Sequence, residues 1–380
     1  MFGIIAATAV TTAAALAVPV AGLFAHRAVR RSANARLMRI DTPNGIDEQG
    51  FVRIGGIDQW ISVRGEDRAN PVLLELHGGP GAANSPYGAR TRAWEEHFTL
   101  VRWDMRGAGL TFAHGGPSGQ GGEPSFERLY ADALEVVHHV RARLGVDRVV
   151  LLPSSFGTVF GLRLARSHPE LFSAYVGTDQ NVLEAGRDTS AYDATLERLR
   201  AAGKAKDVAR LEAMGSDWRR WTPAQRTAYD KLCAGSDRLT LDTVKKVVLG
   251  SMWLSPLYSP ARIVAYFKGQ GFSEPVTAGT HGFDDRAEGT RFEVPFFVFQ
   301  GALDVITPAA RAKAFFDAVE APVKAFALIE GASHFAALRR PDRFLELLLT
   351  HVRPVVTGGT CGTGETGGTG GTGRTGATAV

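Results

Sequence analysis

Ser155 stands where a buried strand gives way to a helix. Residues 149–152 form an apolar run that favours a central strand, and residues 159–165 resume with helical spacing. A serine on so sharp a turn presents its hydroxyl outside the sheet, beside backbone N–H groups that can bind an oxyanion. The pattern therefore predicts a nucleophilic serine. Taken alone, an ordinary strand-to-helix turn with a capping serine explains it equally well.

A nucleophilic serine needs a base to take its proton and a carboxylate to orient that base. Asp304 and His334 each follow a strand-like apolar run late in the chain. We therefore predict that Ser155, Asp304 and His334 form a catalytic triad. The order serine, acid, histidine along the chain is the one that accompanies a nucleophile on a strand-to-helix turn. Asp179 also follows a strand-like run and is the alternative acid.

The oxyanion formed by attack of the serine needs preorganised N–H donors. We expect one donor to be the backbone N–H of Phe156, which directly follows the nucleophile. The second is expected from the glycine turn at residues 77–81, with Gly79 favoured over Gly78, because glycines let bare backbone approach a substrate. No substrate-binding side chain and no metal ligand is assigned.

The elements that must position these residues alternate between strands and helices. This alternation predicts an α/β fold with a mostly parallel central sheet flanked by helices, and a site at the carboxyl ends of the strands. The expected strands and the long helix of the first half, residues 50–181, are a hairpin of 51–54 and 57–63, strands at 72–76, 98–103, 149–152 and 174–177, and a helix at 126–144.

The alternation stops over residues 182–290 and resumes in a second core half over 291–355. The interrupted stretch reads as helices without a convincing strand, and a helical insertion after the strand that follows the nucleophile predicts a cap over the active site. Caps of this kind select substrates. The helices expected in it are residues 189–202, 204–214, 223–234 and 241–248.

The amino terminus is uncharged from Phe2 to Ala25, about 36 Å if helical, against roughly 30 Å for the hydrocarbon core of a bilayer. Residues 1–26 are therefore expected to be a transmembrane anchor or a signal segment. Arginines follow in a basic linker over residues 27–49, which favours an uncleaved anchor, membrane association and a domain on the cytoplasmic side. The alternative is secretion after signal cleavage.

Composition narrows the remaining function classes. Five arginines of the linker account for the formal charge of +4, so nothing indicates a nucleic-acid surface. Cys233 and Cys361 imply neither a disulfide framework nor a zinc site. Residues 356–380 run mostly in Thr-Gly-X triplets and are expected to be a flexible tail outside the fold.

These motifs together resemble the proline iminopeptidase branch of the α/β-hydrolase superfamily. The resemblance covers about residues 50–352 and rests on HGGPG at 77–81, DMRGAG at 104–109, the elbow at Ser155 and the loops of Asp304 and His334. It implies a serine hydrolase with a helical cap that needs no metal or organic cofactor. It also implies a structural role beneath the site for Arg106.

Three positions depart from that family's pattern. Pro153 stands where the elbow has glycine, and Met105 replaces a glutamine. The cap also lacks the family's Glu-Asn-His-Tyr-Phe run, whose acid grips the substrate amine, and residues 263–267 are its nearest echo. The acids that could replace it are Glu184, Asp188 and Asp193.

The sequence therefore predicts a serine hydrolase that cleaves an ester or amide of a small molecule or short peptide through an acyl-enzyme. Aminopeptidase activity is the family-implied class, and a carboxylesterase or lactonase is the alternative. A non-catalytic binding protein with a hydrolase fold is a third reading. The natural substrate and the oligomeric state are not assigned.

Overall fold

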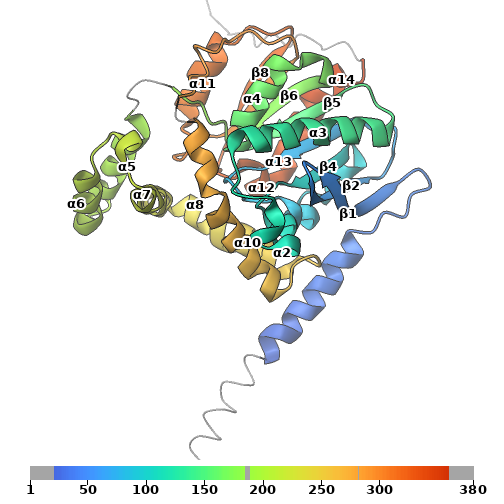
Figure 1. Ribbon diagram of the computed structural model, residues 1–380, viewed down its shortest axis with the longest axis horizontal. Coiled ribbons are helices and arrows are strands. Elements are labelled where there is room, and N and C mark those ends of the chain that lie inside the picture. Colours follow the sequence, from blue (N-terminus) through green and yellow to red (C-terminus); the bar gives the residue numbers. More distant parts are fainter. Residues whose placement is uncertain (1–20, 185–188, 281, 359–380) are drawn as a thin grey trace, which may run out of the picture.

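The computed structural model describes residues 21–184, 189–280 and 282–358. Its sheet has the strand order β1-β2-β4-β3-β5-β6-β7-β8, with β2 antiparallel to β1 and β4 and every later pairing parallel (Figure 1). The expectation of a mostly parallel sheet is confirmed. The strands are β1 (Ile46–Ile54), β2 (Ile57–Gly65), β3 (Val72–Leu76), β4 (Thr99–Asp104), β5 (Val149–Pro153), β6 (Phe172–Thr178), β7 (Phe296–Gly301) and β8 (Lys324–Ile329).

Helices cover both faces of this sheet, and each face has its own apolar core. On one face α3 (Phe126–Leu144), α4 (Gly157–Ser167) and α11 (Ala309–Ala318) contribute to the larger core, and on the other α13 (Pro341–Leu347) packs beside Trp94. The central strands are therefore buried on both sides, which is why they read as continuous apolar runs.

A helical insertion separates β6 from β7, as the sequence predicted. Its helices α5, α6 and α7 share a separate apolar cluster and form a lobe at the left of Figure 1, while α10 packs against α2 (Gly109–Gly115) of the core. The helix α10 was not anticipated. The cap helices are α5 (Ser190–Ala201), α6 (Ala205–Met214), α7 (Pro223–Ser236), α8 (Arg238–Thr243), α9 (Leu249–Leu254) and α10 (Pro260–Ser273), and α12 (Ala336–Arg339) and α14 (Arg353–Val356) complete the core.

The expectation of a transmembrane anchor and of a membrane-associated location is wrong. Within the part of the chain that the structure describes, no helix is both long enough and apolar enough to cross a bilayer. Residues 1–20 of the expected anchor and residues 359–380 of the expected tail lie outside the described residues. The stretch expected as a linker is helical as far as Leu37 and enters β1 at Ile46.

Arginines that the sequence suggested as flanks of an anchor bind the cap instead. Arg27 is buried and donates to the carbonyls of Trp253 and Tyr258, at 2.9 and 2.7 Å. Arg31 donates to the carbonyl of Ser255 at 3.1 Å. The carbonyls of Trp253 and Ser255 lie at the end of α9, where the last C=O groups of a helix lack intrahelical partners, and that of Tyr258 lies in the loop before α10. The amino-terminal helix therefore holds the end of α9.

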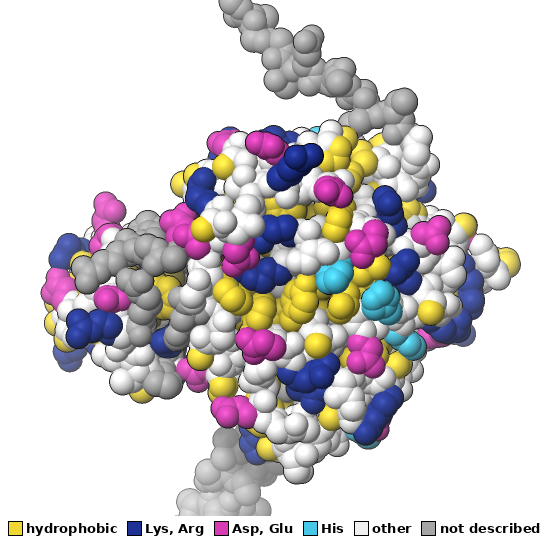
Figure 2. Space-filling model, turned by 45° about the horizontal axis from the view of Figure 1, so that its top comes forward, with side chains coloured by type: hydrophobic (Ala, Val, Ile, Leu, Met, Phe, Trp, Pro, Cys, Tyr) yellow, Lys and Arg dark blue, Asp and Glu magenta, His cyan; other side chains and the backbone are white. Residues whose placement is uncertain are grey.

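The surface charge is mixed where Figure 2 shows it. Among the described residues of that face, basic and acidic side chains are interspersed, and the lobe of α5 to α7 projects at the left. Charged side chains also pair with one another, as in the ion pairs of Arg163 and Arg166 with Glu288.

Candidate active site

Ser155 lies on a tight turn between β5 and α4. Its φ is +53°, a left-handed conformation that is uncommon for residues other than glycine. The turn is held to the neighbouring strands, because the N–H of Ser154 donates to Leu76 and that of Ser155 donates to Thr178, at 2.9 and 3.1 Å. α4 begins two residues later at Gly157. The strained turn presents the hydroxyl above the carboxyl ends of the strands.

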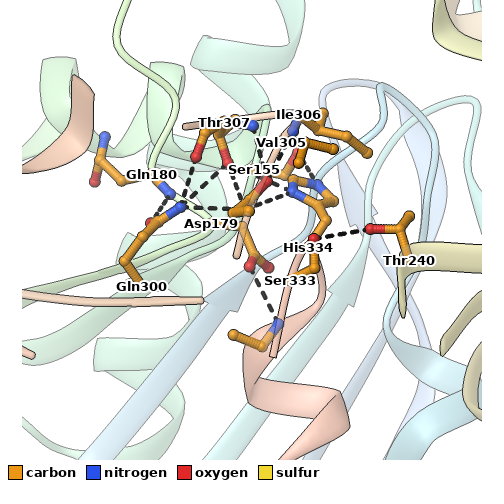
Figure 3. A network of polar contacts seen from close by, with 12 residues as sticks. Ser155, Asp179, Gln180, Thr240, Gln300, Val305, Ile306, Thr307, Ser333 and His334 are labelled. Atoms are coloured by element: carbon orange, nitrogen blue, oxygen red, sulfur yellow. Dashed lines mark hydrogen bonds and ion pairs between the residues drawn. The ribbon is translucent and has the colours of Figure 1, made fainter. Parts of the chain in front are cut away.

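The three residues expected to form the triad come together at this edge. The Nε2 atom of His334 lies 3.0 Å from Oγ of Ser155, and its Nδ1 atom lies 2.9 Å from Oδ2 of Asp304. The carboxylate accepts a hydrogen bond from Nδ1–H, so Nε2 carries no proton and can accept a hydrogen bond from the serine hydroxyl. Figure 3 shows Ser155, Asp179 and His334 gathered at this point, with Thr240 reaching Ser333 on one side. The geometry suits transfer of the serine proton to the imidazole.

The carboxylate of Asp304 is held by a dense set of donors. Its Oδ1 accepts from the backbone N–H groups of Ile306 and Thr307, both at 2.9 Å. Its Oδ2 accepts from the Thr307 hydroxyl at 2.8 Å and from Gln300 Nε2 at 3.1 Å, besides His334. Asp304 therefore has one fixed orientation toward the imidazole.

The pKa of His334 reflects two opposing influences. Burial disfavours the imidazolium, but the negative charges of Asp304 and Asp179 outweigh burial and raise the pKa to about 9. The neutral imidazole that can accept a proton from Ser155 is therefore favoured at alkaline pH.

Asp179, the alternative acid of the sequence, also reaches the site without taking the place of Asp304. It is almost fully buried, and its carboxylate accepts from the N–H of Ala336 at 3.1 Å and from the hydroxyl of Ser154 at 3.3 Å. Asp304, and not Asp179, forms the hydrogen bond with His334 Nδ1.

Two of the expected oxyanion donors, Gly78 and Gly79, line the same cavity as Ser155, and Phe156 directly follows the serine. A Cβ added to Gly78 would lie 2.7 Å from Cβ of Ser155, so the HGGPG turn packs against the serine at a point that has no room for a side chain. Gly79 has a φ of +118°, which only glycine adopts readily. Within the described residues no hydrogen bond engages the N–H of Phe156, Gly78 or Gly79. These groups are available to a developing negative charge.

A buried histidine that the sequence did not single out joins the two glycine-rich motifs. The Nδ1–H of His77 donates to the carbonyl of Gly78 at 2.9 Å, and its Nε2 accepts from the N–H of Met105 at 3.1 Å. Burial lowers the pKa of His77 to about 4, so it is a neutral acceptor. The one sequence feature that could have identified His77 is its position as the first residue of the HGGPG motif. Arg106, in the second motif, pairs with Asp132 of α3 at 2.9 Å and does not line the cavity.

A cavity of about 480 Å³ opens over the serine, between the core and the cap. Asp230 of α7 lines it, and burial raises the pKa of that carboxyl to about 6, with Glu274 adding to the shift and Arg226 opposing it. The sequence did not select Asp230, because one acid on an amphipathic cap helix resembles any solvent-facing acid.

The cap acids named from the sequence lie elsewhere. Glu184 faces Arg286 and Arg311, and Asp193 accepts from the hydroxyl of Thr189 at 2.6 Å. Neither lines the cavity. Asp188 lies outside the described residues.

Asp179, Asp304 and His334 are also the one group in the described ranges whose atoms are close enough to share a metal ion. Their hydrogen bonds correspond to a triad, because both ring nitrogens of His334 are engaged and Asp304 Oδ2 already accepts from it. A metal ligand would need one of these nitrogens free.

Comparisons with known proteins agree with this architecture. A profile described as alpha/beta hydrolase fold matches residues 71–219. The chain is 25% identical to a probable aminopeptidase, YbaC, of Bacillus subtilis (strain 168), over 79% of this chain and 94% of that protein. It is 23% identical to a proline iminopeptidase of Clostridioides difficile (strain 630), over 79% and 96% of the two chains.

A solved structure supports the same fold. The proline iminopeptidase-related protein of Thermus thermophilus superposes with a TM-score of 0.51 at 21% identity, covering 82% of this chain and 99% of that one. The profile, the relatives and the sheet order lead to one conclusion: the chain is a hydrolytic enzyme with the α/β-hydrolase fold, and it is similar to proteins of the proline iminopeptidase-like branch.

Proposed function

We propose that this chain is a serine aminopeptidase that removes a residue with a free amine from a short peptide through an acyl-enzyme. Ser155 is the nucleophile, His334 the general base and then the general acid, and Asp304 the residue that orients the imidazole. The 3.0 Å contact of His334 Nε2 with Ser155 Oγ is the observation that supports the reaction class most directly.

In the first step Ser155 Oγ attacks the carbonyl carbon while its proton passes to His334 Nε2. The carbonyl oxygen becomes an oxyanion, which Phe156 N–H and Gly79 or Gly78 N–H stabilise. The tetrahedral intermediate then collapses, and the proton on Nε2 goes to the leaving amine. Water repeats the sequence on the acyl-enzyme, giving its proton to His334, and Ser155 leaves with that proton.

Asp230 supports the preference for a substrate with a free amine. Its carboxyl belongs to the cap and lines the same cavity as Ser155, where the ammonium group of a substrate would find an opposite charge. Above a pH of about 6 the carboxyl is ionised and can hold that ammonium.

Substituting Asp230 tests the substrate class. Asp230→Asn keeps the shape of the side chain and removes its charge. We expect KM for alanine and proline β-naphthylamides to rise about 10-fold or more, since a hydrogen bond to a charged group contributes roughly 1.5–3 kcal/mol. Hydrolysis of p-nitrophenyl acetate, which has no amine, should be unchanged.

Asp193→Asn is the matched control, because Asp193 is an exposed cap acid outside the cavity. It should leave both substrates unaffected. Equal losses on amide and ester in Asp230→Asn would contradict a role in amine recognition.

A carboxylesterase or lactonase remains the second candidate, and the apolar lining of the cavity favours it. Leu152, Phe267 and Leu338 line the cavity and suit an acyl chain. Under this alternative the wild-type protein hydrolyses p-nitrophenyl acyl esters and shows no activity on the β-naphthylamides. Activity on the amides that depends on Ser155 would exclude a purely esterase function.

A further inference from the structure

Asp179 is a buried carboxylate that the proposed triad does not use. It directly follows β6, is 1% exposed and has a φ of +48°. This left-handed conformation is uncommon for residues other than glycine, and the surroundings of Asp179 impose it. One oxygen of Asp179, one oxygen of Asp304 and one ring nitrogen of His334 all lie within 4.8 Å of one another. The backbone is thus held so that a second acid faces the imidazole.

The direct partners of Asp179 are neutral. Oδ1 accepts from the N–H of Ala336, and Oδ2 accepts from the hydroxyl of Ser154. Among the residues that the structure describes, no lysine or arginine pairs with it. A buried carboxylate is costly unless an opposite charge compensates it. The imidazolium of His334 is the opposite charge that can compensate the carboxylate of Asp179.

The bond to Ala336 also fixes the loop that carries the histidine. Ala336 opens α12 two residues after His334, and the intervening Phe335 has a φ of +67°. A left-handed phenylalanine makes this loop a strained turn. Asp179 therefore joins β6 to the loop at the point where the direction of the imidazole is set.

We propose that Asp179 is a second carboxylate for His334, a positioning residue that fixes the histidine loop and stabilises the imidazolium formed when Ser155 loses its proton. The inference rests on the proposed triad. Asp304 accepts a hydrogen bond from the Nδ1–H group of His334, and Asp179 adds a negative charge from the end of β6. The proton still passes only between Ser155 Oγ, His334 Nε2 and the leaving group, so neither carboxylate changes its protonation state in the step.

The surrounding charges make this role measurable. Asp304 and Asp179 are the two acids that raise the pKa of His334, while burial acts against them. Glu75, Asp230 and Cys233 line the same cavity, and Asp237 of the cap bonds to Ser333, next to the imidazole. Removing the charge of Asp179 should therefore lower the pKa of His334 and leave the other groups in place.

The test is the pH dependence of fluorophosphonate labelling, which reports the reactivity of the serine without a choice of substrate. In Asp179→Asn the amide oxygen still accepts from Ala336 N–H, but the charge is gone. We expect the pH midpoint of labelling to fall by about one unit or more, since a nearby opposite charge shifts a pKa by roughly 1–3 units. The melting temperature should remain close to that of the wild type.

Two further variants complete the design. In Asp304→Asn, Asp179 still faces the imidazole, so labelling should be slowed less than in the double variant Asp304→Asn/Asp179→Asn. Glu184→Gln, an acid outside the cavity, is the control and should keep the wild-type pH midpoint.

An unchanged pH midpoint in a folded Asp179→Asn variant would overturn the inference while leaving the triad intact. Equal labelling rates for Asp304→Asn and the double variant would overturn it as well. A wild-type protein that does not label at all would instead overturn the proposed function, so the two failures are distinguishable.

Discussion

The ring of Pro153 packs against the bare Cα of Gly161, where an added Cβ would lie 2.6 Å from Cγ of the proline. The proline occupies a position of the elbow where bulk is expected to be harmful. Helix α4 accommodates it by carrying no side chain at the point where the helix crosses the end of β5. The missing side chain of Gly161 therefore makes room for the ring of Pro153 beside the Ser155 turn.

This packing predicts that Gly161→Ala destabilises the protein. Overpacking a core contact costs roughly 1–3 kcal/mol, and urea denaturation monitored by circular dichroism measures it. Gly250→Ala in α9 is the control, because nothing lies within 4 Å of its added Cβ, and it should be neutral or stabilising by up to about 1 kcal/mol. In a double-mutant cycle Pro153→Gly should reduce the cost of Gly161→Ala. Independent, additive effects would contradict the contact.

His77 predicts a loss of stability in mild acid. Its folded pKa of about 4 lies below the ordinary value of 6.5, so between these values the unfolded chain binds a proton that the folded chain does not. Stability must therefore fall as the pH falls through this window, by as much as about 3 kcal/mol at 1.36 kcal/mol per pH unit. In His77→Gln the free energy of unfolding, measured by urea denaturation at each pH, should depend less steeply on pH. The same slope in both proteins would exclude His77 as its source.

The contacts of the amino-terminal helix predict that Arg27 affects substrate binding in the cavity. Arg27 donates to the carbonyl of Trp253 in α9 and to that of Tyr258 in the loop after it, and Val248 and Leu249 at the start of α9 line the cavity. Arg27→Ala should lower the free energy of unfolding by roughly 1.5–3 kcal/mol and raise KM, because it leaves buried carbonyls without a charged donor. Arg30→Ala, at an exposed position of the same helix, should change neither quantity. Wild-type KM and stability in Arg27→Ala would contradict the link.

The carboxyl of Asp230 predicts a pH dependence that separates two substrates on one enzyme. The ratio of kcat/KM for alanine β-naphthylamide to that for p-nitrophenyl acetate cancels the titration of His334. It should fall below a pH of about 6, where Asp230 gains a proton and no longer attracts an ammonium. Asp230→Asn should abolish this fall. A ratio that is constant through pH 5–7 in the wild type would show that the carboxyl does not bind the amine.

Much of the core could be predicted because buried parallel strands leave a direct trace in sequence. The runs ending at Leu76 and Leu152 read as strands, and Ser155, Asp304 and His334 each follow such a run. Strand ends meet at one edge of a parallel sheet, so residues far apart in sequence could be assigned to one site. Which acid would bond to the histidine depended on side-chain geometry that spacing does not encode, since Asp179 and Asp304 both reach it.

Other features depended on contacts between distant segments. The apolar run followed by arginines resembled an anchor, but Arg27 bonds to carbonyls more than two hundred residues away. The helix α10 was missed because Gly269 and Gly271 weaken its helical signal, although Gly269 is where Gly107 packs most closely. Asp230 could not be distinguished from other cap acids until the cavity was defined. These features arise from tertiary packing.

The most direct test of the central claim is the intact mass of the protein after treatment with a fluorophosphonate, followed by peptide mapping. We predict the addition of one phosphonyl group, located on Ser155, with loss of labelling in Ser155→Ala and strong slowing in His334→Ala. Labelling of a different residue, or undiminished labelling of a folded Ser155→Ala variant, would contradict the assignment of Ser155 as the nucleophile.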